Sequence, residues 1–220
     1  MKKIWSVFGY VLLYLILTII SLIVLYPIAF AVSGAFNQGR SLASMNILPI
    51  PNNPTTENFT RLFTDTNYLS WYRNSLTIAC INTLCTTFIV LITAYVFSRF
   101  RFRLKKAALM SFLIINMFPN AIGMVAIYVI LNRLNLSDNF AGLILVYTAG
   151  NIPYNTWLLK GYFDTIPRSI DEAARVDGAG NFTTFFRIIL PNTLPMIAFL
   201  AVTSFTQPWM DFIGSVLGSM

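Results

Sequence analysis

The sequence contains no histidine, and charged residues are scarce. Asp, Glu, Lys and Arg together make up 10% of its 220 residues, against about 25% in typical soluble domains. Without histidine, acid–base catalysis and metal coordination by imidazole are excluded. Because 56% of the residues are hydrophobic, a water-soluble fold of this length could not hide its apolar surface. We therefore expect an integral membrane protein.

Two further absences narrow the chemistry. The chain has only two cysteines, Cys80 and Cys85, which form no C-x-x-C motif and fall within a hydrophobic run. We interpret them as buried small hydrophobic residues. No G-x-x-x-x-G-K-[ST] motif occurs, so ATP has no P-loop on this chain. No nucleophile–base pair or metal-ligand cluster emerges from the spacing of polar residues, and we expect no cofactor on the chain itself.

Hydrophobic runs divide the chain into five predicted membrane spans. The first, Ile4–Phe36, exceeds the roughly 7–15 residues of a signal-peptide core and the about 20 residues that cross a bilayer. Pro27 is expected to bend or end it. The other predicted spans are residues 76–97, 107–131, 140–159 and a run from near Met196 into 207–213. The second is rich in Thr and small residues, which favours packing against other helices. The fold class is therefore an all-α, polytopic transmembrane helical bundle.

A polar connection, residues 37–73, separates the first two spans. Prolines at 49, 51 and 54 forbid a continuous helix there and predict an extended, exposed loop.

The basic residues indicate an orientation. Residues 98–106 carry five bases and no acid, and basic runs interleaved with aromatics can bind nucleic acid. This run is short and lies between two spans, so we interpret it as an anchor on the membrane surface. A cytoplasmic N-terminus places Lys2, Lys3, this run and the segment 160–195 inside, as the positive-inside rule requires. The net charge of +7 is thereby explained without nucleic acid.

The segment 160–195 mixes acids, bases and helix signals between two hydrophobic spans. Ser169 and Glu172 fit a capping box at the start of a short helix. Gly178 is placed to adopt the left-handed conformation that ends this helix after Asp177.

A second helix is predicted directly afterwards. Asn181 is placed to cap it, it runs over 182–190, and Pro191 ends it. The segment therefore predicts two short helices joined at a tight glycine bend.

The first of these helices carries a smooth apolar strip of Ile170, Ala173 and Ala174. One interpretation is an amphipathic helix on its own protein's core, with Asp171 and Arg175 as an i,i+4 pair contributing about 0.2–0.5 kcal/mol. The alternative is a docking surface for another protein, because a helix between membrane spans has little soluble core to cover.

The segment resembles the E-A-A…G…I-x-L-P signature of ABC importer permeases. The match is carried by the run 172–174, Gly178 and the run 188–191, and a longer form through Asp177-Gly178-Ala179 resembles the carbohydrate-uptake branch, particularly the second permease of maltose and maltodextrin systems. Glu57 matches a position where that family starts a short helix. The resemblance covers most of the chain from Leu76 onward.

The resemblance implies a non-catalytic permease subunit of a binding-protein-dependent importer of maltodextrin-like oligosaccharides. The implied partners are a second permease in a heterodimer, two cytoplasmic ATPase subunits that bind ATP and Mg²⁺, and an extracytoplasmic sugar-binding protein. The two-helix loop would seat in an ATPase cleft and move as a lever when the ATPase dimer closes. The coupling residues implied are Glu172, Ala173, Ala174, Arg175, Asp177, Gly178, Ile188, Leu190 and Pro191.

Polar side chains in the third and fourth spans are candidates for the translocation path. Pro119 interrupts the backbone hydrogen bonds of the third span. This proline could simply kink the helix, or the broken helix could line the path. Tyr and Asn in the fourth span could contact sugar hydroxyls and rings, or instead hold helices together or form an interfacial belt. The candidates are Asn116, Asn120, Tyr147, Asn151, Tyr154 and Asn155.

We expect residues 1–220 to form a single permease domain of a bacterial cytoplasmic membrane, with residues 160–195 as the cytoplasmic coupling loop. The family would add a sixth span and a C-terminal end beyond Met220. Two rival functions stay open. A permease for another solute, such as amino acids or phosphate, fits less well with the D-G-A…F…I-x-L-P form. An intramembrane enzyme would need a charged or nucleophilic group of residues that the spans do not offer.

Overall fold

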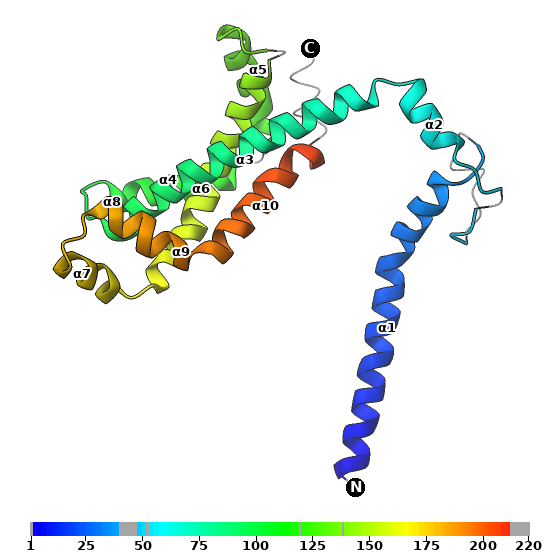
Figure 1. The fold of residues 1–220 in the computed structure, drawn as a ribbon, viewed down its shortest axis with the longest axis horizontal. Helices are drawn as coiled ribbons and strands as arrows, with labels where there is room; N and C mark the ends of the chain where they lie inside the picture. Colours follow the sequence, from blue (N-terminus) through cyan, green and yellow to red (C-terminus); the bar gives the residue numbers. More distant parts are fainter. Residues whose placement is uncertain (1, 40–47, 52, 119, 138, 212–220) are drawn as a thin grey trace. The chain divides into compact units, whose positions relative to one another are not determined.

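A computed structural model of the chain describes residues 2–39, 48–51, 53–118, 120–137 and 139–211 (Figure 1). All regular elements in these ranges are helices, with one isolated bridge between Asn37 and Pro54, which confirms the all-α class. The chain divides into two compact units, Met1–Trp71 and Tyr72–Met220. The assignment of residues 1–220 to a single domain stays a prediction.

The first unit is dominated by the helix α1, Lys2–Ala35, which is 34 residues long. Over Gly9–Ala35 it has a mean hydropathy of 2.7, and no residue of its most apolar 18-residue stretch is buried within the chain. This is expected of a helix surrounded by lipid or by partner helices. Pro27 lies inside α1. Pro27 therefore does not end the first span, since eight more helical residues follow it, and the alternative that it bends the span stays a prediction.

A second helix, α2 (Glu57–Thr64), interrupts the polar connection. Asn58 donates from Nδ2 to the carbonyl oxygens of Ala35 at 3.2 Å and Asn37 at 2.9 Å, so α2 is tied to the end of α1, where the last helical carbonyls accept no bond within the helix. The predicted extended loop is thus wrong for residues 57–64. Residues 55–73 contain no proline, and Glu57 in the first turn complements the helix dipole. The predicted helix start at Glu57 is confirmed.

The second unit contains the remaining helices. In chain order they are α3 (Tyr68–Arg99, whose first turn precedes the unit), α4 (Lys105–Met117), α5 (Asn120–Arg133), α6 (Phe140–Thr165), α7 (Arg168–Val176), α8 (Asn181–Thr183), the π-helix η2 (Thr184–Ile189), α9 (Leu190–Asn192) and α10 (Leu194–Met210). The helix α6 packs against α4 and α10, and α7 packs against η2. The predicted third span is divided between α4 and α5, because Phe118 precedes a proline and is extended, with ψ 132°.

Two of the described helices, α1 and α3, are long and apolar enough to cross a membrane by length and composition. A third span results if Asn181–Asn192 and Leu194–Met210, which meet at 79°, count as one bent span. The count of five spans and the cytoplasmic N-terminus stay predictions.

The buried core of the second unit gathers where α3, α6, η2 and α10 meet. Its fully or nearly buried members are Val90, Ala94, Tyr95, Leu159, Phe163, Phe185, Ile189 and Leu200. Tyr95 contacts the ring of Phe185 at a centroid distance of 4.6 Å. The segment 160–195 is therefore packed onto the ends of the long helices. Cys80 is exposed and Cys85 only half-buried, so the prediction that both are buried is wrong within this chain, because Cys80 lies on the face of α3 opposite Asn82.

Candidate functional site

The helix α7 begins earlier than the sequence predicts. Pro167 occupies the position before the first turn with ψ 135°, and no side chain caps the helix. Ser169 therefore lies inside the first turn, and the predicted capping box between Ser169 and Glu172 is wrong. The proline explains the shift, since it has no N–H to leave unsatisfied and its fixed φ suits helix entry.

Gly178 ends α7 as predicted. Its φ is +81°, in the left-handed region that L-amino acids other than glycine rarely adopt. The Gly178 amide donates to the Arg175 carbonyl at 3.0 Å and the Ala179 amide donates to the Ala174 carbonyl at 2.8 Å. These two bonds form a Schellman motif. A Cβ added at this glycine would have no other atom within 4 Å, so backbone conformation alone requires the glycine.

The second helix of the loop differs from the prediction at both ends. Gly180 is the cap residue and Asn181 is already helical, without a side-chain cap. Pro191 does not end the helix either, because it lies in the first turn of α9, where its missing N–H removes no bond. The preceding turn is the π-helix η2, in which the Leu190 amide reaches back to the Phe185 carbonyl. The chain then bends at the buried Thr193.

The two faces of α7 differ in their surroundings. Asp171 and Ala174 are buried, whereas Glu172, Ala173 and Arg175 are exposed. The apolar strip predicted on this helix is therefore divided. Its Ala174 side packs on the chain's own core, as the first interpretation holds, and its Ala173 side lies beside exposed Glu172 and is open to a partner.

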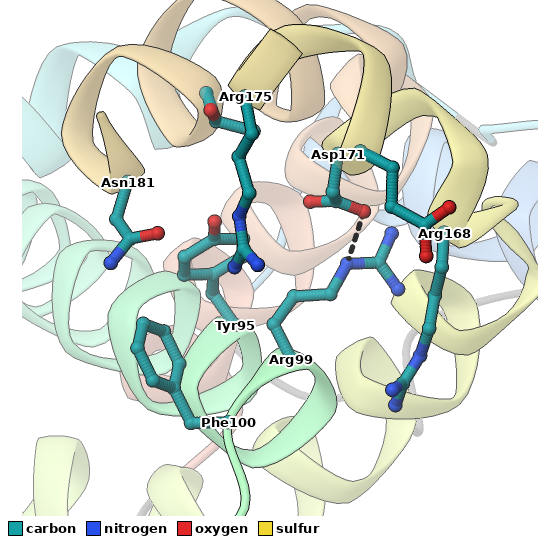
Figure 2. Close-up of a pocket in the computed structure, with 9 residues that line it drawn as sticks. Tyr95, Arg99, Phe100, Arg168, Asp171, Arg175 and Asn181 are labelled. Carbon is teal, nitrogen blue, oxygen red and sulfur yellow. Dashed lines mark ion pairs between the residues drawn. The ribbon is translucent and has the colours of Figure 1, made fainter. Parts of the chain in front are cut away.

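One arginine joins the loop to the membrane helices, and we call this contact the Arg99 junction. Arg99 Nε forms an ion pair with Asp171 Oδ2 at 3.0 Å, with side chains only 7% and 12% exposed (Figure 2). The guanidinium also donates to the Phe163 carbonyl at 3.0 Å and the Ile166 carbonyl at 3.1 Å. These carbonyls lie at the C-terminal end of α6, where the helix leaves its last carbonyls short of helical partners, and the Phe163 carbonyl also accepts from the Ile166 amide at 3.2 Å. Arg99 therefore holds α3, the end of α6 and α7 together.

The sequence pointed to a different partner for Asp171. It predicted an i,i+4 pair with Arg175, but the structure pairs Asp171 with Arg99, which is distant in sequence. Burial accounts for the difference, since a carboxylate at this depth needs a partner that comes from inside the bundle.

A polar chain extends the Arg99 junction along α6. Ser98 Oγ donates to Asp164 Oδ1 at 2.7 Å, Lys160 pairs with the other carboxylate oxygen, and Arg168 donates to the Ser98 carbonyl at 3.3 Å. Partial burial opposes ionisation of Asp164, but the hydrogen bonds from Lys160 and Ser98 hold the pKa of its carboxyl below the usual value. The loop is thus tied to α3 and α6 by charged groups.

A small hollow of about 120 Å³ lies between the loop and the end of α3. Figure 2 shows Arg99 of α3 facing Asp171 of the loop, with Arg175 and Asn181 of the loop also around the hollow. Continuous apolar packing is therefore missing here, and the Arg99 junction carries much of the attachment of α7. Within the described ranges, no three His, Cys, Asp or Glu side chains are grouped to hold a metal.

The predicted path residues differ in their surroundings, and their place in a translocation path stays a prediction. Asn116 is exposed and donates to the Phe112 carbonyl of its own helix at 2.7 Å, and Tyr154 is 59% exposed. Tyr147 and Asn155 are buried. Asn120 begins α5, and its side chain lies outside the part of the structure that is described.

Asn151 instead joins two helices. Its Nδ2 donates to Gln207 Oε1 on α10, and its own carbonyl accepts from Asn155 Nδ2 at 3.0 Å. These contacts support the interpretation that some polar residues of the fourth span hold helices together.

A buried polar hub that the sequence analysis did not single out lies on α3. Asn82 Nδ2 donates to the Ser204 carbonyl of α10 at 2.8 Å. Its Oδ1 accepts from the hydroxyls of Thr86 and Thr148 at 3.2 Å each. All four residues are buried, which confirms for Asn82 and Thr86 the prediction that the second span packs against other helices. The available signal was a lone amide in a Thr-rich span.

Replacing Asn82 with leucine is expected to lower the thermal stability of the solubilised protein. It leaves the hydroxyls and the carbonyl without their partner, at about 1–3 kcal/mol per buried group, reduced in membranes to about 0.6 kcal/mol per bond on average. The midpoint of thermal unfolding in detergent measures this. Asn116→Leu is the matched control, because its amide bonds only within its own helix; an equal fall for both variants would contradict the hub.

Comparison with known proteins identifies the family to which the chain belongs. Residues 68–217 match the model of the binding-protein-dependent transport system inner membrane component. The maltodextrin transport system permease protein MdxG of Bacillus subtilis is 42% identical over 91% of this chain and 71% of its own length. The galactooligosaccharides transport system permease protein GanQ of B. subtilis is 41% identical, with the same coverage. MalD, a maltodextrin permease of Streptococcus pneumoniae, is 41% identical over 92% of this chain and 71% of its own length.

A solved structure shares the fold. It is the crystal structure of a bacterial ABC transporter involved in the import of the acidic polysaccharide alginate, with a TM-score of 0.79 and 23% identity over 93% of this chain and 71% of that chain. The family model spans more than half of this chain, and the loop with its glycine bend lies inside the matched range. The chain belongs to the binding-protein-dependent transport system inner membrane component family, the permeases of ABC importers.

Proposed function

We propose that this chain is the membrane-spanning permease subunit of an ATP-driven, binding-protein-dependent importer of maltodextrin-like oligosaccharides. The relatives named for maltodextrin and galactooligosaccharide transport support the substrate class. Its place is the bacterial cytoplasmic membrane, which it crosses several times. The alternative of another solute class has no comparable support among these relatives.

The observation that carries the proposed mechanism is the two-sided attachment of α7. Its inner face is fixed to α3 and α6 through the Arg99 junction, and its outer face presents Glu172 and Ala173. A partner that moves the outer face therefore moves the membrane helices with it. Such a rigid-body transfer of motion suits alternating access.

Two apolar side chains flank the glycine bend and extend the exposed face. Val176 is 88% exposed and Phe182 is 81% exposed, and Phe182 stacks on Phe186 at a centroid distance of 6.2 Å. The sequence analysis did not assign these residues. Together with Glu172 they offer an apolar surface with one charge, which fits a protein cleft that contains a basic residue.

The exposed face of α7 and the family support a proposed assembly with four kinds of subunit, this permease included. A second permease completes the cavity, and an extracytoplasmic binding protein delivers the sugar. Two cytoplasmic ATPase subunits hold ATP and Mg²⁺ and supply the conformational energy. In this scheme the chain itself catalyses no reaction. Closure of the ATPase dimer moves the loop, and the cavity changes from inward-facing to outward-facing.

Reversing the charge of Glu172 is expected to weaken attachment of the ATPase. Glu172→Lys places a like charge against the basic residue of the cleft, which costs several kcal/mol when juxtaposed, and we expect at least about a tenfold loss of ATPase affinity. Co-purification with the tagged permease and sugar uptake by proteoliposomes measure it. The control is Glu57→Lys on α2, an exposed acid outside the loop; normal ATPase binding and uptake by Glu172→Lys would overturn the coupling role.

A further inference from the structure

The basic run after α3 borders a groove that the transport mechanism does not use. The groove holds about 370 Å³ and lies between the start of α4 and the side of α6. Its polar end is lined by four cations, Arg103, Lys105, Lys106 and Lys160. A cavity of this size with one sign of charge at one end is suited to a bound anion.

These cations are only partly neutralised by the chain. Lys160 pairs with Asp164, but the ion pairs among the described residues do not include Arg103, Lys105 or Lys106. Burial first, and then repulsion from Lys160, lowers the pKa of Lys105. Lys105 and Lys106 also occupy the first turn of α4, which has no acidic residue and no side-chain cap, so they oppose the helix dipole. An anion here would relieve each of these repulsions.

The rest of the groove is apolar. On α4, Lys106, Leu109, Met110 and Leu113 follow at i, i+3, i+4 and i+7, so one face of the helix passes from charged to apolar within two turns. Trp157 of α6 lines the opposite side and is 44% exposed. The predicted third span begins at residue 107. The apolar wall therefore lies within the predicted membrane, and the cations lie at its cytoplasmic surface.

The pairing of a basic rim with an apolar wall selects the occupant. A nucleic acid or an acidic soluble protein would use the cations but would leave the wall inside the membrane uncovered. A free phosphate ion would leave it uncovered too. A lipid satisfies both parts, since basic pockets between membrane helices on the cytoplasmic side bind anionic headgroups.

We propose that this groove binds one anionic phospholipid, with its phosphate at Arg103, Lys105 and Lys106 and an acyl chain against Leu109, Leu113 and Trp157. The proposal rests on the proposed function only in that the chain spans a membrane with this run on the cytoplasmic side. The bound lipid would hold the start of α4 against α6, next to Lys160 and the polar chain that leads to the Arg99 junction.

The test uses the assembled transporter, purified in detergent and titrated with phosphatidylglycerol or phosphatidylcholine, with bound lipid counted by native mass spectrometry. Wild type is expected to retain phosphatidylglycerol at least tenfold more tightly than phosphatidylcholine. The double variant Arg103→Gln/Lys106→Gln should lose about 25-fold in phosphatidylglycerol affinity, at roughly fivefold for each basic residue near an anionic surface. Arg101→Gln is the matched control, because Arg101 belongs to the same basic run but does not line the groove.

Three results would overturn the site. Equal retention of the two lipids would show that charge does not select the occupant, and an equal loss in Arg101→Gln would show general surface attraction. If millimolar inorganic phosphate displaced the lipid as readily as phosphatidylglycerol does, the groove would be a site for small anions and not for a phospholipid. Sugar uptake is measured in parallel: equal retention of the two lipids by a wild-type transporter that takes up sugar normally rejects this site alone, whereas absence of sugar uptake in wild type rejects the proposed function.

Discussion

Replacing Gly178 with valine is expected to cut sugar uptake by about tenfold or more while the protein still inserts into the membrane. Gly178 has φ +81°, and an L-residue held in such a conformation costs of order 1–3 kcal/mol. The chain relieves that strain by unwinding the last turn of α7 or turning the bend. Either change displaces Val176 and Phe182. Only a minor fraction of the molecules then has the loop conformation that binds the ATPase, and the apparent affinity of the permease for the ATPase falls by that fraction.

A matched control lies two residues away. Gly180 has φ −73° and ψ 168°, an extended conformation that valine adopts readily, and nothing lies within 4 Å of its added Cβ. Gly180→Val should therefore transport close to wild type. Uptake by proteoliposomes and membrane insertion, measured by quantitative immunoblot, separate the two variants. Equal activities of Gly178→Val and Gly180→Val would show that the left-handed bend is not required.

The second large effect concerns the Arg99 junction. Arg99→Ala leaves Asp171 as a buried charge without its partner and removes one hydrogen bond from each of the Phe163 and Ile166 carbonyls. Breaking one side of a buried ion pair costs about 3–5 kcal/mol, so both stability in detergent and sugar uptake should fall steeply. The stability and sugar uptake of Arg99→Lys should be intermediate. Its ammonium group can pair with Asp171, but it lacks the planar guanidinium whose separate N–H groups reach two carbonyls at once.

The ratio of sugar transported to ATP hydrolysed separates a coupling role from a structural one. If Arg99 transmits loop movement, Arg99→Lys should assemble with the ATPase and hydrolyse ATP, but carry less sugar for each ATP. A variant with proportional losses of both activities, or with none, would contradict that role. The control is Arg61→Ala, which removes the exposed pair with Glu57. Such a pair contributes only about 0.2–1 kcal/mol, and no change in the ratio is expected.

Local patterns predicted the parts of the site that depend on neighbouring residues. The glycine bend follows from Gly178 and its place after a short helix, whereas the start of α2 at Glu57 was implied only by the resemblance to the permease family. The predicted caps at Ser169 and Asn181 failed because Pro167 and Gly180 occupy the cap positions instead. Capping patterns name residue types that can close a helix, but the backbone decides which of two candidates does so.

Contacts between distant segments could not be predicted in this way. Asn82 and Ser204 are 122 positions apart, and the Arg99 carbonyl contacts reach 64 and 67 positions along the chain. Hydrophobic periodicity assigns a face to a helix but not the helix that covers it. The π-helix η2 was not predicted either, and its buried residues Phe185 and Ile189 pack in the core with residues of α3, α6 and α10.

The central claim is that an ATPase drives this permease through its loop, and site-directed cross-linking tests it most directly. Val176→Cys is placed in a background where Cys80 and Cys85 are serine, and a short thiol–amine cross-linker is applied to the assembled transporter in membrane vesicles. The account predicts a product with the ATPase subunit that changes in yield when ATP is added. Phe63→Cys on α2, 53% exposed, should give none. Absence of the Val176 product while the ATPase co-purifies, or an equal product from position 63, would contradict the account.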